Sequence, residues 1–208
     1  MNGPRLRGLY LITPDLCDTR ELLAVTTPVL AARPALLQYR NKQADAALRR
    51  AQARALLAPC RDHGVPLIIN DDQALAAELG VGVHLGRDDG DLRAARARLG
   101  EAALIGVSCY GDLERARAAV ADGASHVAFG SVFASSTKPD APRVALATLQ
   151  RASAELPVPV CAIGGIDLDN APALLAAGVD LLAVIQDVFG HADPAARARA
   201  YARLFDRR

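Results

Sequence analysis

The sequence predicts an α/β protein, a single (β/α)8 (TIM) barrel, and three observations support that prediction. Short apolar runs alternate with longer segments of helical period, which is typical of parallel strands joined by crossover helices. Eight such units can be counted, and this number favours a closed barrel over an open doubly wound sheet. A length of 208 residues suits one barrel, so we expect residues 1–208 to form a single domain.

The expected elements follow one another along the whole chain. Each strand is a run of four to six mainly apolar residues, at 8–13, 35–40, 66–70, 82–85, 104–109, 126–130, 158–163 and 181–185. Segments of helical period begin near Arg20, Ala44, Asp72, Asp91, Leu113, Leu146, Asp169 and Pro194. A glycine suited to a left-handed helix end precedes several strands, at Gly64, Gly80, Gly100, Gly123 and Gly178.

The composition limits the kinds of partner. Lys and Arg total 24 against 23 Asp and Glu, and a net charge of +1 supplies no broad field for nucleic acid or a membrane surface. Small molecules are therefore the expected partners, and the sequence carries no signal for an oligomeric state. The chain has no apolar run long enough to span a membrane and no secretion signal at its start, so we expect a cytoplasmic location.

The cysteines and histidines show no spacing typical of a metal or redox centre. The four cysteines lie far apart and are expected to be small, reduced core residues: Cys17, Cys60, Cys109 and Cys161. His63, His126 and His191 have no zinc-ligand spacing. His84 ends an apolar strand, where a hydrogen-bonded core residue is more typical than a catalyst.

Cationic residues follow the second expected strand. Gln38, Arg40 and Lys42 alternate at a period of two, which would aim all three to one side if the strand stays extended past its end. Because active sites of such barrels lie at the carboxyl ends of the strands, these cations suggest an anion site. An isolated pair of this kind is, however, more often a pair of solvated loop charges.

Carboxylates follow the third and fourth expected strands. Asp71 and Asp89 would approach each other at the barrel rim, where they are suitable oxygen ligands for Mg2+ that also contacts a substrate phosphate. The alternative is that Asp71 caps a helix and that Asp88 and Asp89 belong to a turn before Gly90. Asp72 is the better candidate for the cap, which leaves Asp71 free.

A second phosphate contact is suggested after the sixth and seventh expected strands. Gly164 and Gly165 permit close backbone approach, and barrel phosphate sites often lie in this region. A plain turn would have the same sequence. The preceding loop adds hydroxyl groups and one more cation, at Ser135, Ser136, Thr137 and Lys138. The residues by themselves thus indicate a Mg2+-dependent barrel enzyme acting on a diphosphate, with a second phosphorylated ligand.

The motifs also resemble those of the thiamine-phosphate synthase family, over nearly the whole chain. Six runs match in order: QYRNK at 38–42, IINDD at 68–72, HLGRDD at 84–89, IGVSCY at 105–110, FGSVFASSTKPD at 129–140 and AIGGI at 162–166. Gln186 departs from the family, which commonly has a small hydroxyl residue there, and Ser125 and His126 replace an acidic and an aromatic residue.

The resemblance implies a division of the site. The pyrimidine diphosphate would be bound by Gln38, Tyr39, Arg40, Asn41, Lys42, Asn70, Ser108 and Lys138. Of these, the resemblance implies catalytic roles for Arg40, Lys42, Ser108 and Lys138, with Mg2+ on Asp71 and Asp89. The thiazole phosphate would be bound by Ser135, Ser136, Thr137, Gly165, Ile185 and Gln186.

The reaction implied by the resemblance joins the pyrimidine to the thiazole nitrogen with loss of diphosphate, giving thiamine monophosphate. Departure of diphosphate requires neutralised charge and excluded water, which the metal and cations would supply. Two alternatives share the barrel: a thiazole tautomerase and a non-catalytic barrel that binds a thiamine precursor. Retention of Asp71 and Asp89 beside Arg40 and Lys42 argues against both.

Overall fold

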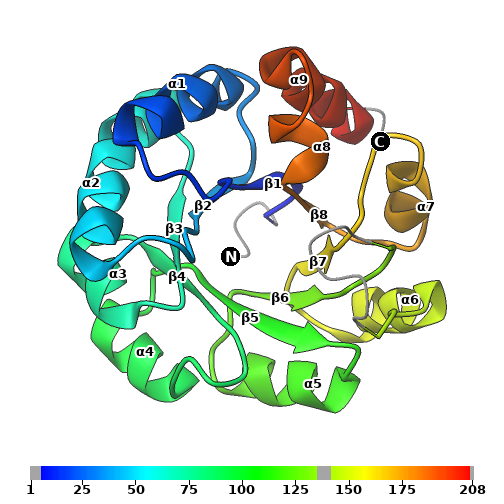
Figure 1. The fold of residues 1–208 in the computed structure, drawn as a ribbon. Helices are drawn as coiled ribbons and strands as arrows, with labels where there is room; N and C mark the ends of the chain where they lie inside the picture. The colour runs from blue at the N-terminus through cyan, green and yellow to red at the C-terminus, as the bar shows by residue number, and fades with distance from the viewer. Residues whose placement is uncertain (1–5, 135–141, 207–208) are drawn as a thin grey trace.

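The computed structural model describes residues 6–134 and 142–206, and its centre is a closed barrel of eight parallel strands. Figure 1 shows the strands enclosed by a ring of helices. The strands pair in chain order, with β8 closing on β1: β1 (Gly8–Ile12), β2 (Leu36–Tyr39), β3 (Leu67–Asn70), β4 (Gly82–Leu85), β5 (Ile105–Tyr110), β6 (His126–Phe129), β7 (Val160–Ile163) and β8 (Leu181–Val184). The predicted barrel is confirmed.

The described residues contain nine helices, one more than expected. They are α1 (Thr19–Leu30), α2 (Ala46–His63), α3 (Gln73–Leu79), α4 (Leu92–Leu99), α5 (Leu113–Ala121), α6 (Leu146–Glu155), α7 (Ala171–Ala176), α8 (Gln186–Phe189) and α9 (Pro194–Phe205). The additional helix, α8, has four residues, too few to produce a helical period in the sequence. The other eight begin within about two residues of the expected positions.

Apolar residues on both faces of the strands explain why the barrel forms. One face packs on the helices in a large cluster that includes Leu37, Val83 and Val127. The other face fills the barrel with a smaller cluster of Tyr10, Ile12, Leu36, Ile68, Ala128, Cys161, Leu181 and Ala183. Parallel strands buried on both faces give nearly continuous apolar runs, which is the pattern seen in the sequence.

The barrel interior also contains three polar aromatic rings. The rings of Tyr10 and His126 are 5.6 Å apart, and those of His84 and His126 are 5.9 Å apart. Gly106 on β5 leaves room for them: a Cβ there would lie 2.3 Å from Nε2 of His126 and 2.5 Å from Nδ1 of His84. Among the described residues, no hydrogen-bond partner is found for Nδ1 of His84 or for either ring nitrogen of His126.

Aspartates begin six of the helices at the end of the barrel where the strands finish. Each accepts a bond from a backbone N–H of the first turn: Asp18, Asp45, Asp72, Asp91, Asp112 and Asp193. Such capping satisfies donors that have no partner within the helix. Asp72 is therefore the cap of α3, as expected, and its Oδ1 is 2.9 Å from the N–H of Leu75.

One arginine ties together the opposite end of the barrel. Arg96 on α4 donates to the carbonyl of Ala103 before β5, at 2.7 Å, and to that of Gly123 before β6, at 2.6 Å. It also donates to the hydroxyl of Ser125, which accepts from the N–H of Ile105. Arg96 thus joins the two loops that lead into β5 and β6.

The cysteine expectation is wrong at one position. Cys60, Cys109 and Cys161 are buried, but Cys17 is exposed because it lies in the loop between β1 and α1. Within residues 6–134 and 142–206, no helix combines the length and apolar character needed to cross a membrane.

Candidate active site

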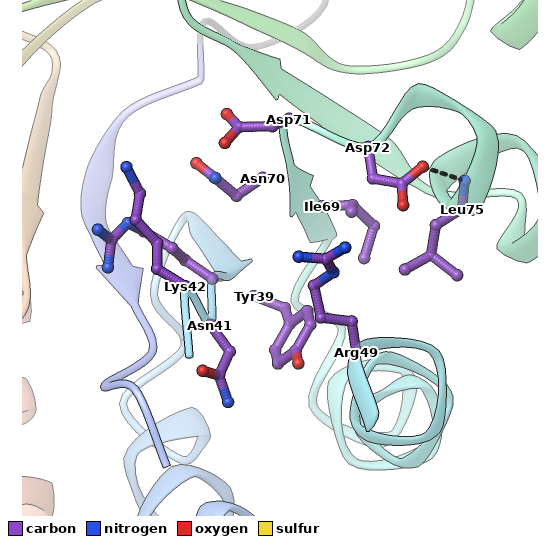
Figure 2. A pocket seen from close by; sticks show the side chains of 10 residues that line it. Tyr39, Asn41, Lys42, Arg49, Ile69, Asn70, Asp71, Asp72 and Leu75 are labelled. Carbon is purple, nitrogen blue, oxygen red and sulfur yellow. Dashed lines mark hydrogen bonds between the residues drawn. The ribbon is translucent and has the colours of Figure 1, made fainter. Parts of the chain in front are cut away.

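A pocket of about 220 Å3 opens at the carboxyl ends of β2 and β3. Figure 2 shows its side chains, which come from these two strand ends and from α2 and α3. The lining residues are Tyr39, Arg40, Asn41, Lys42, Arg49, Ile69, Asn70, Asp71, Asp72 and Leu75. Five residues predicted to bind the pyrimidine diphosphate and one predicted metal ligand therefore lie together in one pocket.

Arg40 and Lys42 lie past the end of β2, which stops at Tyr39. An ion pair between Arg40 and Asp15, at 3.2 Å, orients the guanidinium group. Asp15 also accepts from the N–H of Lys42 at 3.0 Å, so one carboxylate shapes the whole turn. Gln38 is separate from these cations: it points into the barrel and donates to the hydroxyl of Tyr10 at 2.7 Å.

Two residues of the QYRNK run support the loop with bonds to the protein. Asn41 is buried, and its side-chain amide donates to the carbonyl of Leu16 and to Gln52 at 2.7 and 3.0 Å. The hydroxyl of Tyr39 donates to the same Gln52 at 2.8 Å. Burial raises the pKa of Tyr39 to about 12, so its hydroxyl stays protonated. Both residues are thus held firmly at the pocket wall.

The two predicted metal ligands meet at the rim. Asp71 follows β3 with a left-handed backbone, at φ 65°, and Asp89 lies in the loop after β4. Burial raises the pKa of Asp71, and the adjacent Asp89 raises it further, while Lys42 acts in the opposite direction. Asp89 accepts from the N–H of Gly86 at 2.7 Å, which fixes its carboxylate. A pair of carboxylates brought this close is suited to sharing a cation.

Ser108 on β5 is held by a neighbour from the adjacent strand. Its hydroxyl is 2.9 Å from Nε2 of His84 on β4. Arg115 fixes the same segment by donating to the carbonyls of Ser108 and Gly86, at 2.9 and 3.1 Å. Burial lowers the pKa of His84 to about 4, so this histidine is neutral near pH 7. His84 is therefore the hydrogen-bonded interior residue that the sequence predicts.

The glycine pair after β7 lies in close contact with the segment after β6. A Cβ on Gly164 would be 2.1 Å from the hydroxyl of Ser131, and one on Gly165 would be 2.1 Å from the carbonyl of Ala134. Both glycines have positive φ, at 107° and 62°. The N–H of Phe133 also donates to the carbonyl of Gly164 at 3.0 Å. Only glycine fits both positions, which explains the GG sequence.

Ile185 and Gln186 lie where β8 leads into α8. The side-chain amide of Gln186 lies over Gly190, where a Cβ would be 2.3 Å from Nε2. The helix is anchored by Asp187, which accepts from Arg197 at 2.8 Å and from the hydroxyl of Tyr201 at 2.6 Å. Four other residues predicted to bind the substrates lie outside the described residues: Ser135, Ser136, Thr137 and Lys138.

Three features of the site were not predicted from the sequence. Asp15 pairs with Arg40 across 25 positions in the chain. His84 and Ser108 are bonded across neighbouring strands. Arg49 lines the pocket from α2. Nothing in the sequence distinguishes Arg49 from the other arginines of its helix, except its position three residues before Gln52 on the same helical face.

The arrangement can neutralise and orient a polyanion. Arg40, Lys42 and Arg49 carry positive charge around the pocket, while Asp71 and Asp89 could share a divalent cation. The described residues contain no group of three or more His, Cys, Asp or Glu side chains placed to hold a metal, so a metal here would need oxygen atoms from substrate or water. This combination suits a phosphorylated or diphosphorylated substrate.

Comparisons with known proteins agree with one another. The model of the family described as thiamine monophosphate synthase matches residues 9–188. The thiamine-phosphate synthase of Azoarcus sp. (strain BH72) is 62% identical over 204 residues, covering 98% of this chain and 99% of the relative. The thiamine-phosphate synthase of Aromatoleum aromaticum is 56% identical, covering 99% of this chain and 100% of the relative. The solved structure of thiamine phosphate pyrophosphorylase from Pyrococcus furiosus superposes with a TM-score of 0.85 at 29% sequence identity. The match covers 97% of this chain and 96% of that structure's chain.

Proposed function

Because the chain belongs to the thiamine monophosphate synthase family, and its activity is that of a thiamine-phosphate synthase, we propose how the described residues carry out the reaction. A pyrimidine diphosphate binds at the ends of β2 and β3, and a thiazole phosphate binds beside β7 and β8. Mg2+ is held by Asp71 and Asp89. The observation that supports this most directly is the pair of carboxylates beside Arg40 and Lys42.

The donor set at the rim fits a magnesium ion. Asp89 raises the pKa of Asp71, so the two carboxylates disfavour each other's charge when no cation lies between them. Mg2+ usually takes one or two protein carboxylates and completes its coordination with water and substrate phosphate. When bound, the ion would supply charge neutralisation of the diphosphate.

The protein residues contribute binding and orientation. Arg40 keeps a fixed direction through Asp15, so its remaining N–H groups can meet the diphosphate oxygens without reordering. Ser108, held by His84, presents its hydroxyl for the pyrimidine ring, and Gln38 is held in the barrel interior by its bond to Tyr10. The thiazole phosphate contacts the backbone at Gly165, Ile185 and Gln186, since the Gln186 side chain lies over Gly190.

The coupling needs no base or nucleophile from these residues. The bond from the pyrimidine methylene carbon to the diphosphate oxygen breaks with its electron pair on oxygen. The thiazole nitrogen lone pair then forms the new C–N bond, giving thiamine monophosphate and diphosphate. The chain's cations stabilise the leaving group, and its walls align the two rings and exclude water. In this proposal the reaction takes place in the cytoplasm.

The test is formation of thiamine monophosphate from the two substrates, with Mg2+ and with chelator. We expect product only with the metal. Asp71→Asn should abolish metal-dependent coupling, and Asn is chosen because it tolerates the left-handed backbone at φ 65°. Asp72→Ser is the matched control: it removes the adjacent carboxylate but keeps a side-chain cap for α3, so activity should persist.

The outcomes separate the alternatives. Equal product with and without chelator, or full activity in Asp71→Asn, would show that the metal assignment is wrong. Isomerisation of a thiazole phosphate without coupling would indicate a tautomerase. Binding of a thiazole phosphate by folded protein that forms no product would indicate a non-catalytic precursor-binding barrel.

A further inference from the structure

Arg49 lines the pocket and adds positive charge to it, but the proposed function assigns it no specific contact with a substrate. It lies in the first turn of α2, whose buried face is formed by Gln52, Ala53, Leu56 and Cys60. Because residues three and four positions apart share one side of a helix, Arg49 lies on that inward face, at the end nearest the barrel mouth. Figure 2 shows its side chain extending from the helix into the pocket, between Tyr39 and Ile69.

The guanidinium group of Arg49 makes no ion pair or hydrogen bond with residues 6–134 and 142–206. Its Nε atom is buried and lacks a partner. The arginines on the outward face of the same helix differ: Arg54 pairs with Glu78 at 2.7 Å, and Arg50 pairs with the same carboxylate. Burial of an unsatisfied guanidinium nitrogen is costly, so a group that occupies the pocket and accepts its hydrogen bonds would relieve this cost.

The surroundings indicate what that group is. Arg49 shares the pocket with Arg40 and Lys42. The Asp15 carboxylate pairs with Arg40 and forms no ion pair with Arg49. Asp71 lines the same pocket, at the rim that we assign to Mg2+. A guanidinium group offers its donors in a planar fork that matches two oxygens of a phosphate. A fork of this kind in the same pocket as the carboxylate rim suits the phosphate oxygens of a diphosphate.

We propose that Arg49 is a further substrate-binding residue that donates to the diphosphate leaving group of the pyrimidine substrate, an inference that rests on the proposed function. The contact is made to the reactant and to the released diphosphate alike. Arg49 therefore contributes to the affinity for both molecules, and it makes no contribution to binding of the thiazole phosphate.

The experiment compares Arg49→Gln with wild type, in kinetics that vary each substrate separately and in calorimetric binding of inorganic diphosphate with Mg2+. We expect kcat/KM for the pyrimidine diphosphate and affinity for inorganic diphosphate each to fall about 10- to 100-fold, the usual effect of losing a charged hydrogen bond. KM for the thiazole phosphate should stay unchanged. Arg49→Lys should restore part of the diphosphate affinity, because it keeps the charge without the fork.

Arg54→Gln is the matched control, since it removes an arginine from the exposed face of the same helix, and it should leave every parameter unchanged. Diphosphate affinity within twofold of wild type in both Arg49 variants would overturn the inference. If Arg49→Gln folds poorly, the affinity of Arg49→Lys for inorganic diphosphate still tests the inference. A wild-type protein that binds diphosphate through Arg49 but makes no thiamine monophosphate would refute the proposed function and leave this inference standing.

Discussion

Acidification should weaken the fold through His126, whose ring lies at the centre of the barrel. The side chain is completely buried, and both ring nitrogens lack a partner among the described residues. Burial, and then the nearby His84, lower the pKa of His126 from 6.5 to about 3 in the folded protein. The folded state therefore keeps this ring neutral at pH values where the unfolded chain has already bound a proton.

The sign and size of the effect follow from the difference between the two pKa values. The pKa of His126 is lower in the folded protein than in the unfolded chain. The stability contributed by its neutral ring is therefore fully present above pH 6.5 and is lost as the pH falls toward 3. Between pH 7 and pH 5 the free energy of unfolding should decrease by about 2 kcal/mol through His126. His84 contributes in the same direction, since burial lowers its pKa to about 4.

The comparison that isolates His126 is wild type against His126→Phe, by urea denaturation at pH 7 and pH 5. The variant should lose about 2 kcal/mol less on acidification, and at pH 7 it should be at least as stable, because two unpartnered nitrogens are removed from the interior. His191→Gln, at an exposed position, should retain the wild-type pH dependence. Equal losses in wild type and His126→Phe would refute the reasoning.

Three further substitutions test other parts of the structure by urea denaturation at pH 7. Gly106→Ala should destabilise the protein by about 1–3 kcal/mol, because its Cβ would overlap both barrel histidines; an unchanged midpoint would contradict the packing. Asp71→Ala should be less stable than Asp71→Asn by about 1–2 kcal/mol, since alanine resists the left-handed backbone; equal stabilities would argue against that conformation. Tyr201→Phe should cost about 1.5–3 kcal/mol by removing the bond to Asp187, and no loss would show that this bond is dispensable.

Much of the barrel was predictable because its strands are buried on both faces, so each appears in the sequence as an apolar run such as that of β3 or β8. The ends of the strands were equally informative. Asn70 and Asp71 follow an apolar run directly, and Asp72 has the position of a helix cap. The helix α8 was missed because four residues carry no period.

The parts of the site that escaped prediction depend on tertiary neighbours. The direction of Arg40 is set by Asp15, which belongs to a different loop. The bond between His84 and Ser108 depends on the register of β4 against β5, where His84 pairs with Gly106. Arg49 lies in a segment with several arginines, and only packing of α2 against the barrel selects which of them faces the pocket. Local sequence cannot encode these choices independently of the fold.

The hydrogen bonds of Arg96 mark a region where substitutions should affect folding and not catalysis. They lie in the loops before β5 and β6, at the end of the barrel away from Asp71 and Asp89. Changes at Arg96 or Ser125 should therefore alter the amount of folded enzyme and leave the turnover of each folded molecule intact. Selection for thermal tolerance and selection for a new substrate can then act on opposite ends of the same barrel, so the chain can accumulate stabilising substitutions without a cost in catalysis.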